Sequence, residues 1–177
     1  MIELYALMWV VATFTGVIGF LRGWNREVVV TAACVLGMFL LFQFDTLLRG
    51  TILVSLSRDQ TFFIQAGLFL LIVYVAYRNR SFTSSRARGR AISAEGILGA
   101  LIGFFNGYLI MGALWYFLDI NEYPLDPLII APSITSPSAQ NLAAMPMVIL
   151  SGGVGGSGDF LAVIVIILLL FVILAIG

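Results

Sequence analysis

Five apolar runs, each close to the length that a helix needs to cross a membrane, constrain this chain more than any other feature. A helix of about 20 residues spans the hydrocarbon core, because each residue rises about 1.5 Å and backbone polar groups must be paired inside lipid. The runs occupy residues 4–21, 28–44, 61–77, 96–118 and 160–177. The sequence therefore predicts an all-α, multi-pass transmembrane protein with about five membrane helices.

The second and third runs are the least secure spans, because they are short and carry Gln43 and Gln65. They either cross the bilayer or form a tight hairpin that does not fully cross. The polar stretch between them, residues 45–60, repeats apolar side chains at helical spacing. We expect this stretch to form either an interfacial helix or a simple extension of the second span.

Composition excludes most catalytic chemistry. The chain has no His, no Lys and one Cys, so imidazole bases, Schiff-base lysines, Cys/His zinc sites and intrachain disulfides are ruled out. Cys34 lies in an apolar run, where a buried thiol acts as a small hydrophobe. We expect a protein that is not an enzyme, with no catalytic residue, no metal site and no cofactor. A pigment held by an asparagine or a backbone carbonyl would leave no sequence signature.

The arginines predict the topology, because basic loops resist translocation and stay cytoplasmic. With five spans, the first and third loops share one side and together hold most of the arginines. These are Arg22, Arg26, Arg78, Arg80, Arg86, Arg88 and Arg90. The N-terminus is then outside and the C-terminus inside a bacterial cytoplasmic (inner) membrane. Only Phe82 interleaves with the charges of the third loop, so nucleic acid is not an expected partner.

Residues 119–159 differ in kind from the other loops. They hold all five prolines of the chain, four acids and no base, and they end in the glycine tract SGGVGGSG. Proline at these intervals forbids a long helix and favours extended or turn structure, and the glycine tract is typical of a flexible tether. We expect a partner subunit to hold this loop, and the apolar run 160–177 to stand in lipid or against another subunit.

Small residues predict where the helices touch, because lipid tails are as apolar as Leu and helices associate where backbones can approach. The first run offers Gly16, Gly19 and Gly23, and the fourth offers Gly99, Gly103 and Gly107 at i, i+4, i+8 spacing. We expect these two runs to pack together. Asn106, beside the second stripe, either makes a structural hydrogen bond or lines a polar path.

The stretch GFLRGWNRE, residues 19–27, is expected to form the turn between the first two helices. Arg22 and Arg26 would reach the headgroups, Trp24 would sit at the interface, and Glu27 would favour the N-terminal dipole of the next helix. The alternative is that the two arginines contact a partner or ligand.

Two stretches resemble the colicin V production protein (CvpA) family. GVIGFLRGWNREVV is similar to the family's first turn, where one helix ends in Gly-Phe-x-Arg-Gly and Arg-Glu opens the next. ILGALIGFFNGYLIMGALWYFLD is similar to its Leu-Gly-x-x-x-Gly-x-x-Arg-Gly stretch, with Asn106 where the family usually has Arg. The resemblance covers roughly residues 1–120. It implies a CvpA-like four-helix membrane domain in residues 1–118, followed by the loop 119–159 and an additional helix 160–177 that is not a typical family feature.

The same resemblance implies a small inner-membrane protein linked to toxin production or export, and elsewhere to tethering a protease. It carries over no catalytic residue. We therefore expect a non-enzymatic scaffold or accessory subunit of a larger complex, such as a photosynthetic or respiratory assembly. Its partners would be the lipid bilayer and other membrane subunits, contacted through the loop 119–159 and the helix 160–177. A channel or export component is the alternative.

Overall fold

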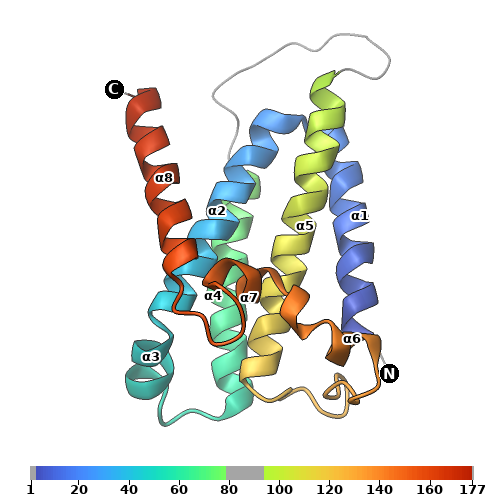
Figure 1. Cartoon of the computed structure of the whole chain (residues 1–177), viewed down its shortest axis with the longest axis vertical. Coiled ribbons are helices and arrows are strands. Elements are labelled where there is room, and N and C mark those ends of the chain that lie inside the picture. The colour runs from blue at the N-terminus through green and yellow to red at the C-terminus, as the bar shows by residue number, and fades with distance from the viewer. Residues whose placement is uncertain (1–2, 79–93, 177) are drawn as a thin grey trace.

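The computed structural model describes residues 3–78 and 94–176 of the chain. Four long helices run up and down beside one another (Figure 1). They are α1 (Leu4–Arg22), α2 (Trp24–Gln43), α4 (Arg58–Arg78) and α5 (Ala94–Ile120), and each is long and apolar enough to cross a membrane. The all-α multi-pass architecture is confirmed. The second and third runs, which were the least secure spans in the sequence, form helices of 20 and 21 residues. This length is enough to cross the hydrocarbon core.

The last helix, α8 (Asp159–Ile176), corresponds to the fifth expected run. It lies against α2 and leans away from the bundle towards its C-terminal end (Figure 1). Leu161 and Val165 are buried, whereas Ile166 and Ile167 are more than half exposed. The contact of α8 with the bundle is therefore concentrated in its first turns.

The stretch after α2 is neither a straight extension nor one long interfacial helix. Phe44 leaves the helical conformation, with φ −95° and ψ 11°, so α2 ends there. Two short pieces follow, α3 (Asp45–Leu47) and the π-helix η1 (Leu48–Ile52). They form a folded turn that leads the chain back into α4.

The α1 and α5 helices approach closely enough for backbone contact along the predicted glycine stripes. A Cβ added to Gly103 would lie 2.5 Å from the Thr15 carbonyl oxygen and 2.9 Å from the Gly19 Cα. One added to Gly107 would lie 2.6 Å from the Ala12 Cα, and one added to Gly99 would meet the Gly19 carbonyl oxygen. The expected packing of the first run on the fourth is confirmed.

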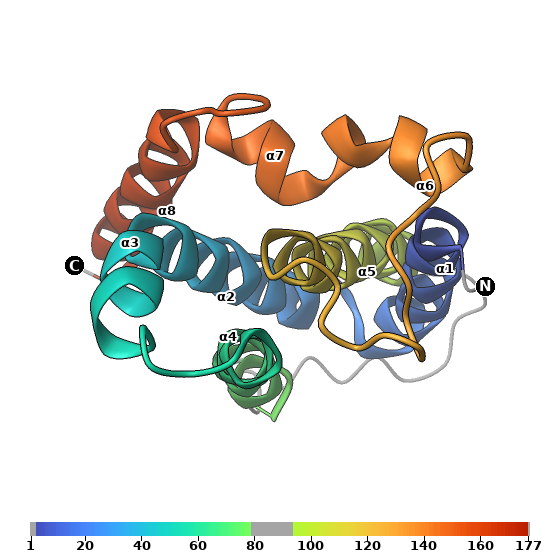
Figure 2. The ribbon, with the colours of Figure 1, turned by 90° about the horizontal axis from the view of Figure 1, so that it is seen from below.

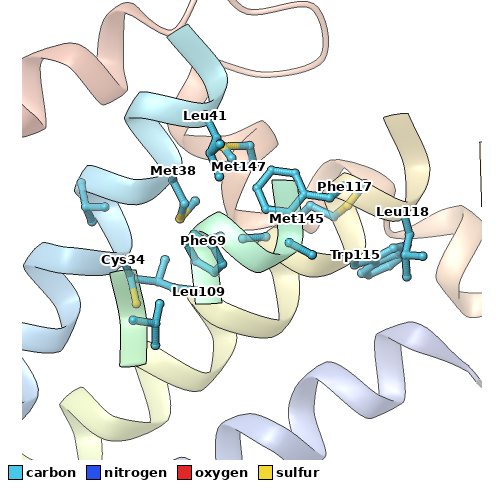
Figure 3. Close-up of a cluster of buried hydrophobic side chains, with 14 of the residues drawn as sticks. Cys34, Met38, Leu41, Phe69, Leu109, Trp115, Phe117, Leu118, Met145 and Met147 are labelled. Atoms are coloured by element: carbon cyan, nitrogen blue, oxygen red, sulfur yellow. The ribbon is translucent and has the colours of Figure 1, made fainter. Parts of the chain in front are cut away.

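The hydrophobic core is centred between α2, α4 and α5 and extends onto Met145 and Met147 of the loop. Figure 3 shows its sulfur-containing and aromatic side chains facing one another. Gly37 of α2 lets the Phe69 ring of α4 approach, because a Cβ there would lie 3.1 Å from Phe69 Cδ2. Cys34 is fully buried in this core, as expected of a thiol that acts as a small hydrophobe.

The Pro/Gly-rich loop contains regular structure that the sequence interpretation did not predict. It folds into α6 (Pro137–Gln140), the 3-10 helix η2 (Leu142–Ala144) and α7 (Pro146–Ser151). Pro137 and Pro146 each stand in the first turn of a short helix, where the missing N–H costs nothing. The expectation of extended or turn structure is wrong for these residues, because proline forbids only the interior of a helix.

This part of the loop is held by the chain itself. Figure 2 shows α6 and α7 lying along the side of the bundle formed by α1, α5 and α2. The Tyr108 hydroxyl of α5 donates to the Ala144 carbonyl oxygen at 2.6 Å. The Pro146 ring occupies the space that a side chain at Gly112 would need, and Met147 is fully buried. Residues 137–151 are therefore packed against helices of the same chain.

The start of α1 is hydrogen-bonded to the same loop. The Ser138 hydroxyl donates to a Glu3 carboxylate oxygen at 2.7 Å and accepts from the Tyr5 N–H at 3.1 Å. After α7, the glycine tract turns the chain into α8, with positive φ angles at Gly152 and Gly158 among others. The Gly158 N–H donates to the Ser151 carbonyl at 2.9 Å, so the tract is a closed turn here and not a loose tether.

The α1/α5 contact gives a direct test of the fold. We expect Gly103→Ala to lower the free energy of unfolding by about 1–3 kcal/mol, because its methyl group would meet backbone atoms that cannot move aside. Gly67→Ala on α4 is the matched control, since nothing lies within 4 Å of its added Cβ. Unfolding in mixed micelles, followed by circular dichroism, measures both. Equal stabilities of the two variants would contradict the packing.

Candidate functional site

A fully buried carboxylate marks the most unusual place in the bundle. Glu27 stands in the first turn of α2 with none of its surface exposed. The Arg22 Nη1 group, at the end of α1, donates to Glu27 Oε1 at 2.6 Å. The one-residue turn at Gly23, with φ 82°, places the two helix ends side by side. An ion pair in this position avoids leaving an uncompensated charge in a dry environment.

Arg22 also fastens the end of α4 to the pair. Its Nη2 group donates to the Tyr77 carbonyl oxygen at 3.1 Å, and its guanidinium carbon lies 4.5 Å from the centre of the Tyr77 ring. That ring contact has the geometry of a cation–π interaction. Only 17% of the Arg22 side chain is exposed. Arg22 therefore does not simply extend to the headgroups, as the sequence interpretation expected.

Asn106 of α5 supplies the hydrogen-bond donor to the second carboxylate oxygen of Glu27. It is fully buried, and its Nδ2 group donates to both the Glu27 carbonyl oxygen and Glu27 Oε2, each at 2.9 Å. The Thr31 hydroxyl donates to Asn106 Oδ1 at 2.6 Å. We call Arg22, Glu27, Thr31, Tyr77 and Asn106 the Glu27 network. It joins α1, α2, α4 and α5 at one point.

Within the Glu27 network, the side chains of Glu27 and Asn106 are fully satisfied by the other members. Both carboxylate oxygens of Glu27 accept hydrogen bonds. The Asn106 side chain donates through Nδ2 and accepts through Oδ1. Among the described side chains, the Tyr77 hydroxyl is the one buried polar atom without a partner. Of the two roles left open for Asn106, the observed contacts are those of a structural hydrogen bond.

A second polar cluster lies at the opposite end of the bundle. Arg49 forms a bidentate ion pair with Asp45, with Nε 2.8 Å from Oδ1 and Nη2 2.6 Å from Oδ2. This pairing raises the pKa of Arg49 above its ordinary value. Gln65 of α4 donates to Asp45 at 3.2 Å and accepts from Asn121 at 2.8 Å. Gln65 is fully buried, and its polar atoms are hydrogen-bonded within the protein. Its presence therefore does not argue against the third run as a membrane span.

The end of α5 carries a further buried polar contact. Trp115 Nε1 donates to the Tyr123 hydroxyl at 3.1 Å, and that hydroxyl donates to Asp119 at 3.1 Å. Burial raises the pKa of Tyr123 to about 12. Because the neutral phenol is the form favoured by folding, its contribution is complete below about pH 10 and is lost as the pH rises towards 12.

The other residues singled out from the sequence occupy varied places. The six stripe glycines gather at the α1/α5 contact, where Gly16 faces Ala100 and Gly99 faces Gly23. Arg78 ends α4 and donates to the Tyr74 hydroxyl at 3.3 Å, and Arg26 also takes part in an interaction. The remaining predicted cytoplasmic arginines lie outside the described residues. They are Arg80, Arg86, Arg88 and Arg90.

The roles of Glu27 and Thr31 were missed by the sequence interpretation. It began the second membrane run at residue 28, which left Glu27 in the turn. The signal was present, because Glu27 and Thr31 stand at i, i+4 spacing and share one face of α2 with Cys34. What could not be seen is that Asn106, 79 residues further along, meets that face.

Comparison with family models, with curated proteins and with solved structures gave no match for this chain. The resemblance to the CvpA family therefore stays a prediction. Within residues 3–78 and 94–176, no group of three or more His, Cys, Asp or Glu side chains is placed to hold a metal ion.

The hydrogen bond between Asn106 and Glu27 can be tested by mutation. Asn106→Leu is expected to cost about 1–3 kcal/mol of unfolding free energy, because it leaves Glu27 Oε2 buried without a donor. This exceeds the average of about 0.6 kcal/mol for hydrogen bonds between membrane helices. In a Glu27→Leu background the same substitution should cost much less, since no carboxylate remains to be satisfied. A double-mutant cycle in mixed micelles measures the coupling; additive effects would contradict it.

Proposed function

We propose that this chain is a non-enzymatic membrane scaffold that serves as an accessory subunit of a larger bacterial membrane complex. Three features support the proposal: the buried Glu27 and Asn106 side chains are bonded to each other, residues 137–151 are packed on the bundle, and the loop after α5 exposes three large apolar side chains. The last of these carries the proposal.

The apolar surface lies on the loop that follows α5. Leu128 is 80% exposed and Ile134 91% exposed, and Ile130 between them is 46% exposed. We call these three residues the loop patch. The loop leaves α5 beside Asp119, Glu122 and the Asp45 cluster, and this concentration of charge is typical of the water side of a membrane boundary.

Large apolar side chains in such a place are typical of a contact surface. Burying each of them against a partner would contribute about 1.5–3 kcal/mol relative to leaving it in water. Asp126 stands beside the patch, and Asp119 and Glu122 lie near it in the chain. Glu122 is paired with Arg58, but Asp126 beside the patch would repel anionic headgroups, so a protein surface with apolar and basic residues is the favoured occupant.

The topology proposed with this function keeps the predicted orientation. Arg22, Arg26 and Arg78 lie at one end of the bundle, and the loop patch belongs to the other. With the arginine end in the cytoplasm, the N-terminus and the loop patch are outside, and the partner is contacted on the outer side of the inner membrane.

The proposal predicts a complex that depends on the loop patch. Solubilised from its native membrane in mild detergent, the chain should migrate in blue native electrophoresis as part of an assembly much larger than its own 19.3 kDa. The double variant Leu128→Asn, Ile134→Asn should migrate alone, because it removes most of the apolar area offered to the partner.

Val154→Asn is the matched control, since Val154 is 85% exposed and lies in the glycine tract before α8. It should leave the assembly intact. A wild-type chain that migrates alone, or a control that disrupts the assembly equally, would refute the accessory-subunit role.

A channel or export component is the second candidate, because Asn106 stands near the middle of α5 in a multi-pass protein. It requires water to reach Asn106. In a Cys34→Ala background, Asn106→Cys should then react with membrane-impermeant thiol reagents from at least one side. The scaffold proposal expects no reaction from either side, because Asn106 is fully buried and bonded to Glu27 and Thr31.

A further inference from the structure

The start of α1 is capped by a residue from a distant part of the chain. The first N–H groups of a helix have no partner inside the helix, and the residue before the helix commonly supplies one. Glu3 holds that place but makes no such bond with its side chain. The Tyr5 N–H donates instead to the Ser138 hydroxyl at 3.1 Å, and that hydroxyl donates to Glu3 Oε2 at 2.7 Å. We call Glu3, Tyr5 and Ser138 the N-terminal junction.

The central residue of the N-terminal junction is buried. Ser138 has only 1% of its surface exposed. Figure 2 shows α6, which contains Ser138, beside the N-terminal end of α1. A protein that binds this chain from outside therefore cannot contact Ser138 directly. Any effect of Ser138 on binding must act through the position of the loop.

One end of the loop patch is joined to the N-terminal junction by a series of short-range hydrogen bonds. Ser136 caps α6, because its hydroxyl accepts from the Ala139 N–H at 3.2 Å. The Ser136 N–H donates to the Ser133 carbonyl oxygen at 2.8 Å and closes a turn that contains Ile134. Ile134, the most exposed member of the loop patch, therefore lies on a turn whose last residue caps the helix that Ser138 joins to α1.

The other end of the loop patch is held at α5. Tyr123 is buried, and its hydroxyl accepts from Trp115 Nε1 at 3.1 Å. The Leu128 N–H donates to the Leu125 carbonyl oxygen at 2.7 Å, so Leu128 lies on a turn that begins two residues after Tyr123. Leu128 and Ile134 thus belong to separate turns with separate anchors, one on α5 and one on α1. The separation of the two side chains depends on both anchors.

We propose that the N-terminal junction positions the loop patch for its partner, so that the order of residues 3–5 and partner binding are coupled. A partner that contacts both Leu128 and Ile134 needs their separation fixed, because ordering a flexible surface on binding lowers affinity. Coupling between two sites is reciprocal, so a junction that favours binding is itself stabilised by binding. The inference rests on the proposed accessory-subunit function. It goes beyond that function because it makes Glu3 and Ser138 positioning residues of a surface to which they do not belong.

Two serine substitutions test the coupling from the side of the junction. Ser138→Ala removes both hydrogen bonds of the hydroxyl, and Ser151→Ala is the matched control. Ser151 is also buried in the packed part of the loop, but its hydroxyl bonds locally to Val148 and Gly153. In blue native electrophoresis of native membranes, Ser138→Ala should lower the ratio of assembled to free chain about five-fold or more. Ser151→Ala should leave the ratio near that of the wild type, and the same ratio in both variants would overturn the proposal.

Two variants of Glu3 show whether the hydrogen bond is the cause. Glu3→Gln keeps a side-chain oxygen that can accept from the Ser138 hydroxyl, whereas Glu3→Ala removes it. The ratio of assembled to free chain should fall about five-fold or more in Glu3→Ala and stay near the wild-type value in Glu3→Gln. A loss of the same size in both variants would contradict positioning by this hydrogen bond.

Hydrogen exchange tests the coupling from the side of the loop patch. The double variant Leu128→Asn, Ile134→Asn keeps every residue of the N-terminal junction and should migrate alone. By mass spectrometry, amide exchange in residues 3–8 should be about five-fold or more slower in the wild-type assembly than in this free variant. A merely structural role of Ser138 would not produce that difference, and equal exchange would refute the coupling.

The same measurements separate this inference from the function on which it rests. A wild-type chain that migrates alone refutes the accessory-subunit function, and the coupling to a partner falls with it. A wild-type chain that assembles, with Ser138→Ala and Ser151→Ala assembling equally well, refutes only the positioning role of the N-terminal junction.

Discussion

The close approach of α1 and α5 is the contact on which the other features of this protein depend. Helices in lipid gain little from hiding apolar side chains, so they associate where van der Waals contact between backbones is possible. Gly19, Gly99 and Gly103 provide that contact here. It also sets a register: with Gly99 beside Gly23, α2 must begin next to α5, and Glu27, one turn later, arrives opposite Asn106.

This register explains how the bundle tolerates a carboxylate with no exposed surface. An isolated charge in such a place would be very costly, but Arg22 neutralises it and Asn106 satisfies the remaining oxygen. Arg22 reaches Glu27 across the turn at Gly23, whereas Asn106 comes from α5, so the second carboxylate oxygen is satisfied only when α5 is packed in place. Backbone packing and polar pairing are therefore two consequences of one geometry.

The sequence predicted the features that depend on local spacing and missed those that depend on register between helices. Gly99, Gly103 and Gly107 share one face by helical periodicity alone, so their contact with α1 could be foreseen. The bond from Asn106 to Glu27 could not, because no pattern within either helix fixes their relative height. Likewise, Pro146 was correctly taken to interrupt long helices, but its fit against Gly112 joins residues whose proximity only the folded chain reveals.

The packing of the Pro/Gly-rich loop also narrows where a partner could bind. Residues 137–151 use their buried surface on α1 and α5: Ser138 is bonded to Glu3, Ala144 to Tyr108, and Met147 has no exposed surface. The contacting face of this segment is thus used by the bundle, although Ile149 on its outer face remains about half exposed. The earlier part of the loop has the opposite character, since Leu128 and Ile134 are almost free of contact. Because the same chain holds one part of the loop and leaves Leu128 and Ile134 exposed, the exposed part is the surface that the proposed partner would contact.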